Sequence, residues 1–335
     1  MRPPPKEPTE VVIMRELLTA GDGFVSGNRL AKQLGISRVA IWAHMEKLRS
    51  HGYTFEAVRR RGYRLTGRPP GLDELLLRAS LVHRTPPPHL IFLPRTDSTN
   101  TEAERQLAAG AETPFVVLTR EQTKGRGRLG RKWVSEDRGN FYASLAFRPE
   151  LRPSRMQDFT LWMGVNVCEA LANSCRIDAG VKWPNDILHQ GRKLGGMLTE
   201  ARIDADRTRD VVFGLGLNLN SQRRDWPEDI APRTTSVAEA LGQPVDVNRI
   251  AVAIISRVLK AFDDFVGGEY RENFAQMWER FDVLRGRRTT VLFGETRIEG
   301  TAEGIDSTGA LKLRDDKGHL HRCHAGDVTI EKTPA

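Results

Sequence analysis

The residues most able to do chemistry lie in a glycine- and arginine-rich segment at positions 124–132. It contains three glycines, five basic side chains and no acidic one. Glycines let a backbone approach a ligand and present its N–H groups, and arginines supply forked donors for phosphate oxygens. The spacing is not GxxxxGK[ST], so a P-loop is not predicted. The segment therefore suits the binding of phosphate oxygens, with a flexible solvated loop as the alternative.

Three later segments supply a polar turn and glycines inside strands. Residues 181–188 (VKWPNDIL) predict a strand interrupted by a turn, residues 193–200 (KLGGMLTE) a strand, and residues 211–220 (VVFGLGLNLN) the last core strand. The glycines inside these strands are Gly195, Gly196, Gly214 and Gly216. A glycine weakens a strand unless another group must approach its backbone. The four glycines therefore predict a flat ligand lying against a sheet, with two β-bulges as the structural alternative.

Hydrophobic periodicity and turn residues place the elements that must position these segments. Helices are predicted at 72–82, 101–109, 235–241 and 247–266, and strands at 90–93 and 115–119. Ser98 or Thr99 could act simply as the N-cap of the helix at 101–109. From about residue 285, short alternating strands are predicted at 289–293, 296–302, 310–314, 319–323 and 327–331. Such a pattern with glycine-containing turns is typical of a small β-barrel.

The amino-terminal 66 residues predict a DNA-binding fold. A helix at 10–20 is followed by a second helix after Ser26, a turn at Gly35, and a third helix that Ser37 caps and that runs to about Leu48. This order and spacing favour a helix-turn-helix. Strands at 53–58 and 62–65 would then form the wing of a winged helix.

Two groups of side chains in this module are candidates for DNA contact. The residues expected to face the major groove or the phosphates are Ser37, Arg38, Val39, Trp42 and Ala43 on the third helix and Arg59, Arg60 and Arg61 at the wing tip. Trp42 could instead pack inside and shift this register. A winged helix used for protein contacts is the alternative to operator binding.

The charge distribution supports a nucleic-acid partner for the same region. The net charge is +8, and residues 1–66 hold 12 basic and six acidic side chains. Most of the excess therefore sits in the first fifth of the chain, which suggests one region facing a polyanion. A basic excess that serves solubility alone is the alternative.

Composition excludes several other classes. The chain is 39% hydrophobic and 28% charged, typical of a globular protein of two or three domains. No apolar run approaches a membrane span, and the first ten residues lack a signal-peptide pattern. The three cysteines form no CxxC pair, and the histidines at 319, 321 and 324 belong to a solvated strand. We expect a cytoplasmic protein with no membrane contact and no metal site.

Taken together, these patterns predict an α+β multidomain protein. The Pro/Gly-rich segment at 66–71 (TGRPPG) marks a boundary. We expect a winged helix-turn-helix domain at 1–66, a central mixed-sheet α/β catalytic domain at 67–284, and a small β-barrel domain at 285–335.

The motifs GRGRLGRKW, KWPNDIL, KLGGMLTE and GLGLNLN, in this order, resemble those of the biotin–protein ligases. With the winged helix in front, the chain is similar to the bifunctional type that is also the biotin operon repressor. The resemblance covers essentially the whole chain. It implies a class II synthetase-like ligase domain and an SH3-like C-terminal domain. It also implies a ligase that forms biotinyl-5′-AMP from biotin and Mg-ATP, then transfers biotin to a lysine of a carboxylase carrier domain.

The resemblance assigns roles to particular positions. It implies that Ser98, Thr99, Asn100 and Gln122 surround biotin, and that Gly125, Arg126, Gly127 and Arg128 close over the intermediate. Lys193 would meet the biotin carboxylate and the phosphate, and the rings would lie against Gly195, Gly196, Gly214 and Gly216. It also implies a homodimer whose formation is coupled to bound biotinyl-AMP, the corepressor.

The chemistry requires such residue types. A carboxylate attacking the α-phosphate brings two anions together, which Lys193, Arg126 and Arg128 would offset. Transfer needs a neutral lysine amine, whose reference pKa is about 10.4. Asp186 is the candidate that accepts its proton or orients it, and tying down the Pro184 turn is its alternative role. Trp133 could cover the adenine or anchor the loop.

Three other functions compete with this interpretation. They are a ligase whose winged helix does not bind an operator, a transcription factor whose body only senses a ligand, and a ligase for another acid such as lipoate. The complete GRGRLGRKW segment together with Gln122 and Lys193 argues against a pure sensor, which does not require a catalytic set.

Overall fold

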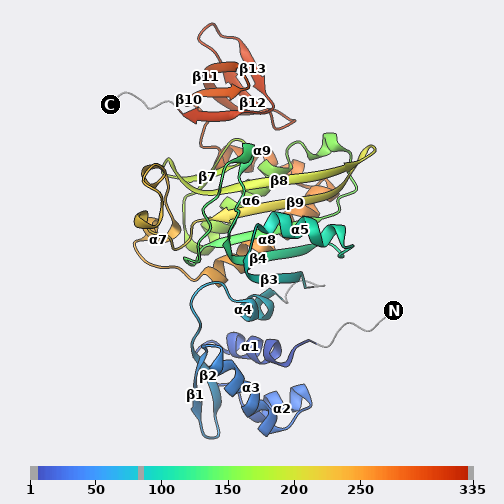
Figure 1. Ribbon diagram of the computed structural model, residues 1–335, viewed down its shortest axis with the longest axis vertical. Helices are drawn as coiled ribbons and strands as arrows, with labels where there is room; N and C mark the ends of the chain where they lie inside the picture. Colours follow the sequence, from blue (N-terminus) through green and yellow to red (C-terminus); the bar gives the residue numbers. More distant parts are fainter. Residues whose placement is uncertain (1–6, 82–86, 331–335) are drawn as a thin grey trace. The chain divides into compact units, whose positions relative to one another are not determined.

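The computed structural model describes residues 7–81 and 87–330, and it divides into two compact units, Met1–Pro88 and His89–Ala335. Figure 1 traces the chain. Some predicted positions lie outside the described residues. They are residue 82 of the predicted helix 72–82, residue 331 of the last predicted strand, and the ends of the first and last predicted domains. No helix in the described part is long and apolar enough to cross a membrane.

The first unit is the predicted winged helix. Its elements are α1 (Thr9–Ala20), α2 (Gly27–Leu34), α3 (Arg38–Ser50), β1 (Thr54–Val58), β2 (Gly62–Gly67) and α4 (Glu74–Ser80). Gly35 adopts the left-handed conformation between α2 and α3, with φ of 67°. The Ser37 hydroxyl accepts a hydrogen bond from the Ala40 N–H at 3.1 Å and so caps α3.

This unit extends past the predicted boundary at residue 66. Leu76 and Ala79 of α4 belong to the same apolar core as Met14 of α1 and Ile41 of α3. The Asp73 carboxylate caps α4 by accepting from the Leu76 N–H at 3.0 Å. The segment at 66–71 therefore does not end the unit, because the helix after it packs on α1.

The second unit is built around a mixed sheet of seven strands. Its strands are β3 (His89–Thr96), β4 (Phe115–Gln122), β5 (Phe141–Phe147), β6 (Gly180–Lys182), β7 (Asp186–His189), β8 (Arg192–Asp204) and β9 (Arg207–Leu217). They lie in the order β3-β4-β5-β9-β8-β7-β6. Within the described residues, β3 and β4 pair in parallel and the other neighbouring strands of this sheet pair antiparallel.

The helices of the second unit are α5 (Thr99–Ala108), α6 (Phe159–Cys175), α7 (Val237–Leu241), α8 (Val247–Gly267) and α9 (Tyr270–Phe281). The two faces of the sheet differ in what packs on them. Side chains alternate between the faces of a strand. On β5, Ala146 packs with α5 through Ala103, whereas the Phe147 ring lies against Phe159 of α6. The α5 face therefore carries Ser144, and the opposite face carries the aromatic core.

The last strands form the predicted small β domain. They are β10 (Arg288–Phe293), β11 (Thr296–Ile305), β12 (Leu311–Arg314), β13 (Leu320–Cys323) and β14 (Asp327–Ile330), in the antiparallel order β13-β12-β11-β10-β14. His319 and His321 both contact the Asp315 carboxylate, at 3.3 and 2.9 Å. These histidines are thus engaged with a neighbouring acid on a largely exposed strand.

Candidate active site

A cavity of about 800 Å³ collects the predicted motifs of the second unit. The predicted residues that line it are Ser98, Thr99, Asn100, Gln122, Arg126, Gly127, Arg128, Trp133, Asp186, Lys193, Gly196, Gly214 and Gly216. Gly125 and Gly195 are not part of its lining. Sequence segments more than 100 residues apart therefore meet in one place because β4, β8 and β9 belong to the same sheet.

The glycine–arginine loop folds back on itself at the cavity. Arg126 and Lys132 form an isolated antiparallel bridge, and the Gly127 N–H donates to the Arg131 carbonyl at 2.7 Å. The Trp133 N–H donates to the Gly125 carbonyl at 2.9 Å. A Cβ on Gly125 would overlap the Trp133 carbonyl. This glycine therefore serves close approach within the loop.

The turn before α5 is tied to β4 by Gln122. The Gln122 side-chain oxygen accepts from the Thr99 N–H at 2.8 Å and the Thr99 hydroxyl at 3.2 Å. Ser98 takes the N-cap position of α5, but its side chain makes no capping hydrogen bond. The capping alternative thus does not explain why Ser98 and Thr99 are buried beside the cavity.

Asp97 fixes the start of this turn. Its carboxylate accepts from the Ser98 N–H at 2.8 Å and pairs with the Arg105 guanidinium. The Arg105 hydrogen bond lowers the pKa of Asp97 to about 2 despite partial desolvation. The turn is consequently held by an ionised carboxylate at neutral pH.

The glycines of β8 and β9 face protein side chains. A Cβ on Gly216 would lie 2.6 Å from the Trp133 indole, and one on Gly196 would lie 3.2 Å from it. A Cβ on Gly214 would overlap the Asn100 amide, and one on Gly195 would overlap Leu217. The indole of Trp133 thus occupies the face on which the sequence predicted a flat ligand.

The bulge alternative holds at one of the two glycine pairs. The register between β7 and β8 shifts where Ile187 pairs with Gly195 and Leu188 pairs with Lys193. Leu194 is therefore the extra residue of an irregularity beside Gly195. The pairing of β9 with β5 and β8 is regular at Gly214 and Gly216. These two glycines are explained by close packing of Asn100 and Trp133.

Asp186 forms an ion pair with Lys193 in a part of the cavity lining that also contains Lys182 and Arg128. The Lys193 ammonium lies 2.6 Å from the Asp186 carboxylate and 5.5 Å from the centre of the Trp133 ring. Burial lowers the pKa of Lys182, Asp186 opposes this shift, and Lys193 adds to it. Arg128 donates to the Asn185 side-chain oxygen at 3.2 Å and to the Gly326 carbonyl at 3.4 Å. The Asp186 carboxylate is thus engaged in an ion pair with Lys193.

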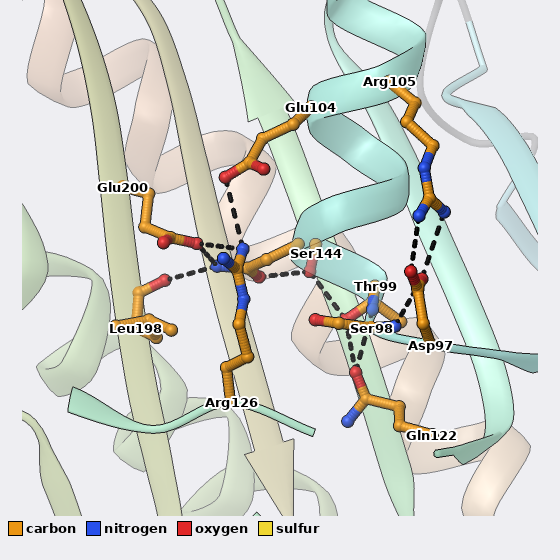
Figure 2. Close-up of polar contacts among 11 residues, drawn as sticks. Asp97, Ser98, Thr99, Glu104, Arg105, Gln122, Arg126, Ser144, Leu198 and Glu200 are labelled. Atoms are coloured by element: carbon orange, nitrogen blue, oxygen red, sulfur yellow. Dashed lines mark hydrogen bonds and ion pairs between the residues drawn. The ribbon is translucent and has the colours of Figure 1, made fainter. Parts of the chain in front are cut away.

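The Arg126 side chain meets two carboxylates (Figure 2). Its Nη2 lies 2.8 Å from Glu200 Oε2 and 3.2 Å from Glu104 Oε1. The same Glu200 oxygen accepts from the Asn100 side-chain amide at 2.7 Å. The loop is thereby joined to β8 and to the first turn of α5.

Several residues of the cavity were not predicted from the sequence. They are Lys182, Asn185, Trp226, Ile230, Arg233 and Thr234 in the lining, with Ser144, Glu104 and Glu200 in contact with lining residues. Lys182, Asn185 and Glu200 stand within motifs that drew attention. The segment around residues 226–234 has no comparable local signal, because it becomes part of the wall only through folding.

In the first unit, α3 presents a partly apolar outer surface. Val39 is 74% exposed and Trp42 is 56% exposed, while Ile41 is buried. Trp42 therefore points outward, and the alternative in which it packs inside is wrong. Ser37, Arg38 and Ala43 are exposed as well.

The turn between β1 and β2 presents the three wing arginines. Arg59, Arg60 and Arg61 are all exposed. The Arg61 guanidinium lies 4.2 Å from the centre of the Phe24 ring, a cation–π contact that directs this side chain back toward the module.

Comparisons with known proteins agree with this geometry. Residues 92–218 match the Biotin/lipoate A/B protein ligase family, residues 12–64 an HTH domain, and residues 285–330 the Biotin protein ligase C terminal domain. The biotin protein ligase from Aquifex aeolicus, solved in complex with biotin and ATP, superposes with a TM-score of 0.62 at 28% identity, over 73% of this chain and 99% of that one.

Relatives that match nearly the whole chain decide the family. The chain is 33% identical to the bifunctional ligase/repressor BirA of Bacillus subtilis strain 168 over 93% of its own length and 95% of the relative's. It is 30% identical to the protein of the same name from Escherichia coli K12, over the same shares. The chain therefore belongs to the biotin–protein ligase family, of the type that carries a helix-turn-helix domain in front of the ligase domain.

Proposed function

We propose that this chain activates biotin with ATP to biotinyl-5′-AMP, transfers biotin to a lysine of a carboxylase carrier domain, and represses transcription through its winged helix in response to biotin. One observation carries the enzymatic part. Arg126, Arg128 and Lys193 line the same cavity as the Thr99–Gln122 pair, in a chain of this family.

In the first step a biotin carboxylate oxygen attacks the α-phosphorus of ATP. A bond from that oxygen to phosphorus forms, the bond to the bridging oxygen breaks, and pyrophosphate leaves. Both reactants are anions, and negative charge builds on the phosphoryl oxygens in the transition state. Cations from Lys193, Arg126 and Arg128 would offset this charge. Mg²⁺ would enter with ATP, since this ion binds mainly through substrate phosphates and water.

In the second step the carrier lysine attacks the acyl carbon of the mixed anhydride and AMP leaves. The attacking amine must be neutral and must lose a proton as the amide forms. Asp186 stands at the cavity as the acceptor or orienting group. Its carboxylate is paired with Lys193, so it becomes free for the amine when Lys193 turns to the phosphate.

The remaining residues would bind the two substrates. We assign biotin to the turn Ser98-Thr99-Asn100 with Gln122, where buried donors and acceptors suit an uncharged ring. Gly127 and the loop backbone would cover the intermediate, and Gly196, Gly214 and Gly216 would form the sheet side of the site. Trp133 stands on Gly196 and Gly216, where its outer face would cover the adenine.

For repression we propose that biotinyl-AMP acts as the corepressor and that the bound form is a homodimer. Helix-turn-helix proteins usually bind two half-sites related by two-fold symmetry. In each copy α3 would enter the major groove with Arg38, Val39 and Trp42. The wing arginines would contact phosphates or the minor groove.

A transfer assay tests the enzymatic proposal. The protein is incubated with labelled biotin, ATP, Mg²⁺ and a carboxylase carrier domain, and a carrier whose acceptor lysine is replaced by arginine is the matched control. We expect label on the wild-type carrier alone. Transfer of lipoate in place of biotin would overturn the substrate assignment. An operator-binding assay with and without biotin and ATP tests the proposed repression. Equal operator affinity in the presence and absence of biotin and ATP would overturn the proposal that repression responds to biotin.

A further inference from the structure

One carboxylate oxygen connects three separate segments beside the cavity (Figure 2). Glu200 Oε2 lies 2.8 Å from Arg126 Nη2 and 2.7 Å from the Asn100 side-chain nitrogen. Glu200 is on β8, Arg126 is in the glycine–arginine loop, and Asn100 is in the first turn of α5. Glu200 is not in the cavity lining, whereas Arg126 and Asn100 are. Glu200 therefore contacts the cavity lining through these two residues.

From Asn100, a chain of hydrogen bonds continues through Ser144 and Thr99 to Gln122. The Asn100 nitrogen also donates to the Leu198 carbonyl at 3.2 Å, and its side-chain oxygen accepts from the Ser144 hydroxyl. Ser144 also contacts the Thr99 hydroxyl at 2.7 Å, and Thr99 donates to Gln122. Thr99, Asn100 and Ser144 are buried. Because both ends of the Asn100 amide are engaged, its orientation is fixed.

On the Arg126 side only one corner of the guanidinium meets the carboxylates. Glu200 and Glu104 both bond to Nη2. A guanidinium is planar, with five N–H groups in a rigid fork. Holding Nη2 therefore sets the direction of Nη1 and Nε, which these two ion pairs do not use. Arg126 lines the cavity, so the rest of its fork can meet an anion there.

We propose that Glu200 is a positioning residue for ligand binding. It holds Arg126 in register with the turn that contains Ser98, Thr99 and Asn100, so that the anion-binding loop and the biotin-binding turn act as one unit. This inference rests on the proposed assignment of Arg126 to an anionic group of the ligand, the biotin carboxylate or a phosphate.

The substitution Glu200→Gln tests the role of the charge. It keeps an oxygen that can accept from Asn100 but removes the negative charge that holds Arg126. We expect the KM for biotin to rise about tenfold, as for a lost charged hydrogen bond, with kcat within about twofold. The difference from wild type should shrink at high salt because the pair is partly exposed. Separate titrations with biotin and with ATP show which anion Arg126 meets.

Glu104→Gln is the matched control. Glu104 contacts the same Arg126 nitrogen at a longer distance, has a more exposed side chain than Glu200, and lies in α5. An exposed ion pair contributes little, so we expect less than about a twofold change in the KM for biotin. An equal effect of the two substitutions would show that local charge, and not the link to Asn100, matters.

A double-mutant cycle with Arg126→Met completes the test, with biotin binding measured at equilibrium so that loss of catalysis does not obscure it. If Glu200 acts through Arg126, Glu200→Gln adds no further loss to Arg126→Met. An additive loss would overturn the inference. The inference would also be overturned if Glu200→Gln bound biotin as tightly as the wild type while Arg126→Met bound biotin weakly. Unchanged binding of both biotin and ATP in Arg126→Met itself would instead remove the assignment of Arg126 to an anionic group.

Discussion

The glycine–arginine loop at 124–132 and the wing turn at 59–61 are both basic, and both are proposed to meet phosphates. They hold their arginines in different ways. In the loop, Arg126 pairs with Glu104 and Glu200, and Arg131 pairs with Asp327. In the wing, all three arginines are exposed at a turn, and the Arg61 guanidinium lies against the Phe24 ring.

The difference corresponds to the two kinds of anion. A small ligand gains from cations whose directions are set before it arrives, because no reorganisation is then needed. A DNA backbone offers many phosphates and a counterion atmosphere, so mobile exposed cations suffice and binding depends on salt. Substitutions in the two regions should therefore have separable effects.

The largest effect is expected from Lys193→Ala. Loss of a fixed cation at the developing charge should reduce adenylate formation by about 10²- to 10³-fold, measured as biotin-dependent pyrophosphate release. Operator binding without ligand should not change. Arg192→Ala is the neighbouring control, because Arg192 lies 3.8 Å from Glu239 and outside the cavity lining. Full activity in Lys193→Ala would remove this lysine from the site.

Replacement of Arg59, Arg60 and Arg61 by alanine should weaken DNA binding and leave ligation unchanged. Each lost phosphate contact lowers the slope of log affinity against log salt by about 0.9, so up to three contacts give a clearly flatter dependence. Ligation by the same triple variant serves as the internal control and should be unchanged. A loss of ligation would contradict the separation of the two regions.

Trp42→Ala probes the recognition helix without changing charge. Because Trp42 is exposed, the fold should persist, while specific operator affinity falls about tenfold if the indole meets base edges. Gel-shift titrations with operator and scrambled DNA at one salt concentration measure this. Equal losses on both sequences would mean that Trp42 contacts only the backbone. An operator affinity of the unaltered protein no higher than for scrambled DNA would favour a ligase without operator binding.

Gly216→Ala tests the packing of Trp133 against the sheet. The added methyl group would lie 2.6 Å from the indole, so the ring must move, at a cost of about 1–3 kcal/mol in unfolding free energy. The KM for ATP should rise if Trp133 covers the adenine. In a Trp133→Ala background the same glycine substitution should cost less. An unchanged KM for ATP would leave Trp133 as an anchor of the loop only.

The smallest effect is expected from Asp97→Asn. The pKa of Asp97 is lowered from 3.8 to about 2, so its ionised form stabilises the folded state above pH 4. The contribution is lost as pH falls through about 2. Partial exposure limits it to about 0.5–1 kcal/mol. Denaturant unfolding should show a larger difference in stability between wild type and variant at pH 7 than at pH 2.

Local patterns recovered the segments whose signals are local. The N-cap at Ser37 was predicted from capping preferences, and the turn at Gly35 was predicted from the preference of glycine for left-handed backbone. The structure confirms both. Two of the elements that were missed are buried on nearly all sides. Every residue of β5 is buried, and α6 is apolar around most of its circumference. Periodicity identifies an element only when one face meets water.

The sequence by itself determined the family-specific motifs, the winged helix and the types of residue that the chemistry needs, because these depend on neighbours along the chain. Tertiary structure alone decided what each motif touches. It placed Trp133 on Gly216, paired Asp186 with Lys193, and brought Glu200 to Arg126 across 74 residues of sequence. Such contacts depend on strand order and register, which short-range patterns do not specify.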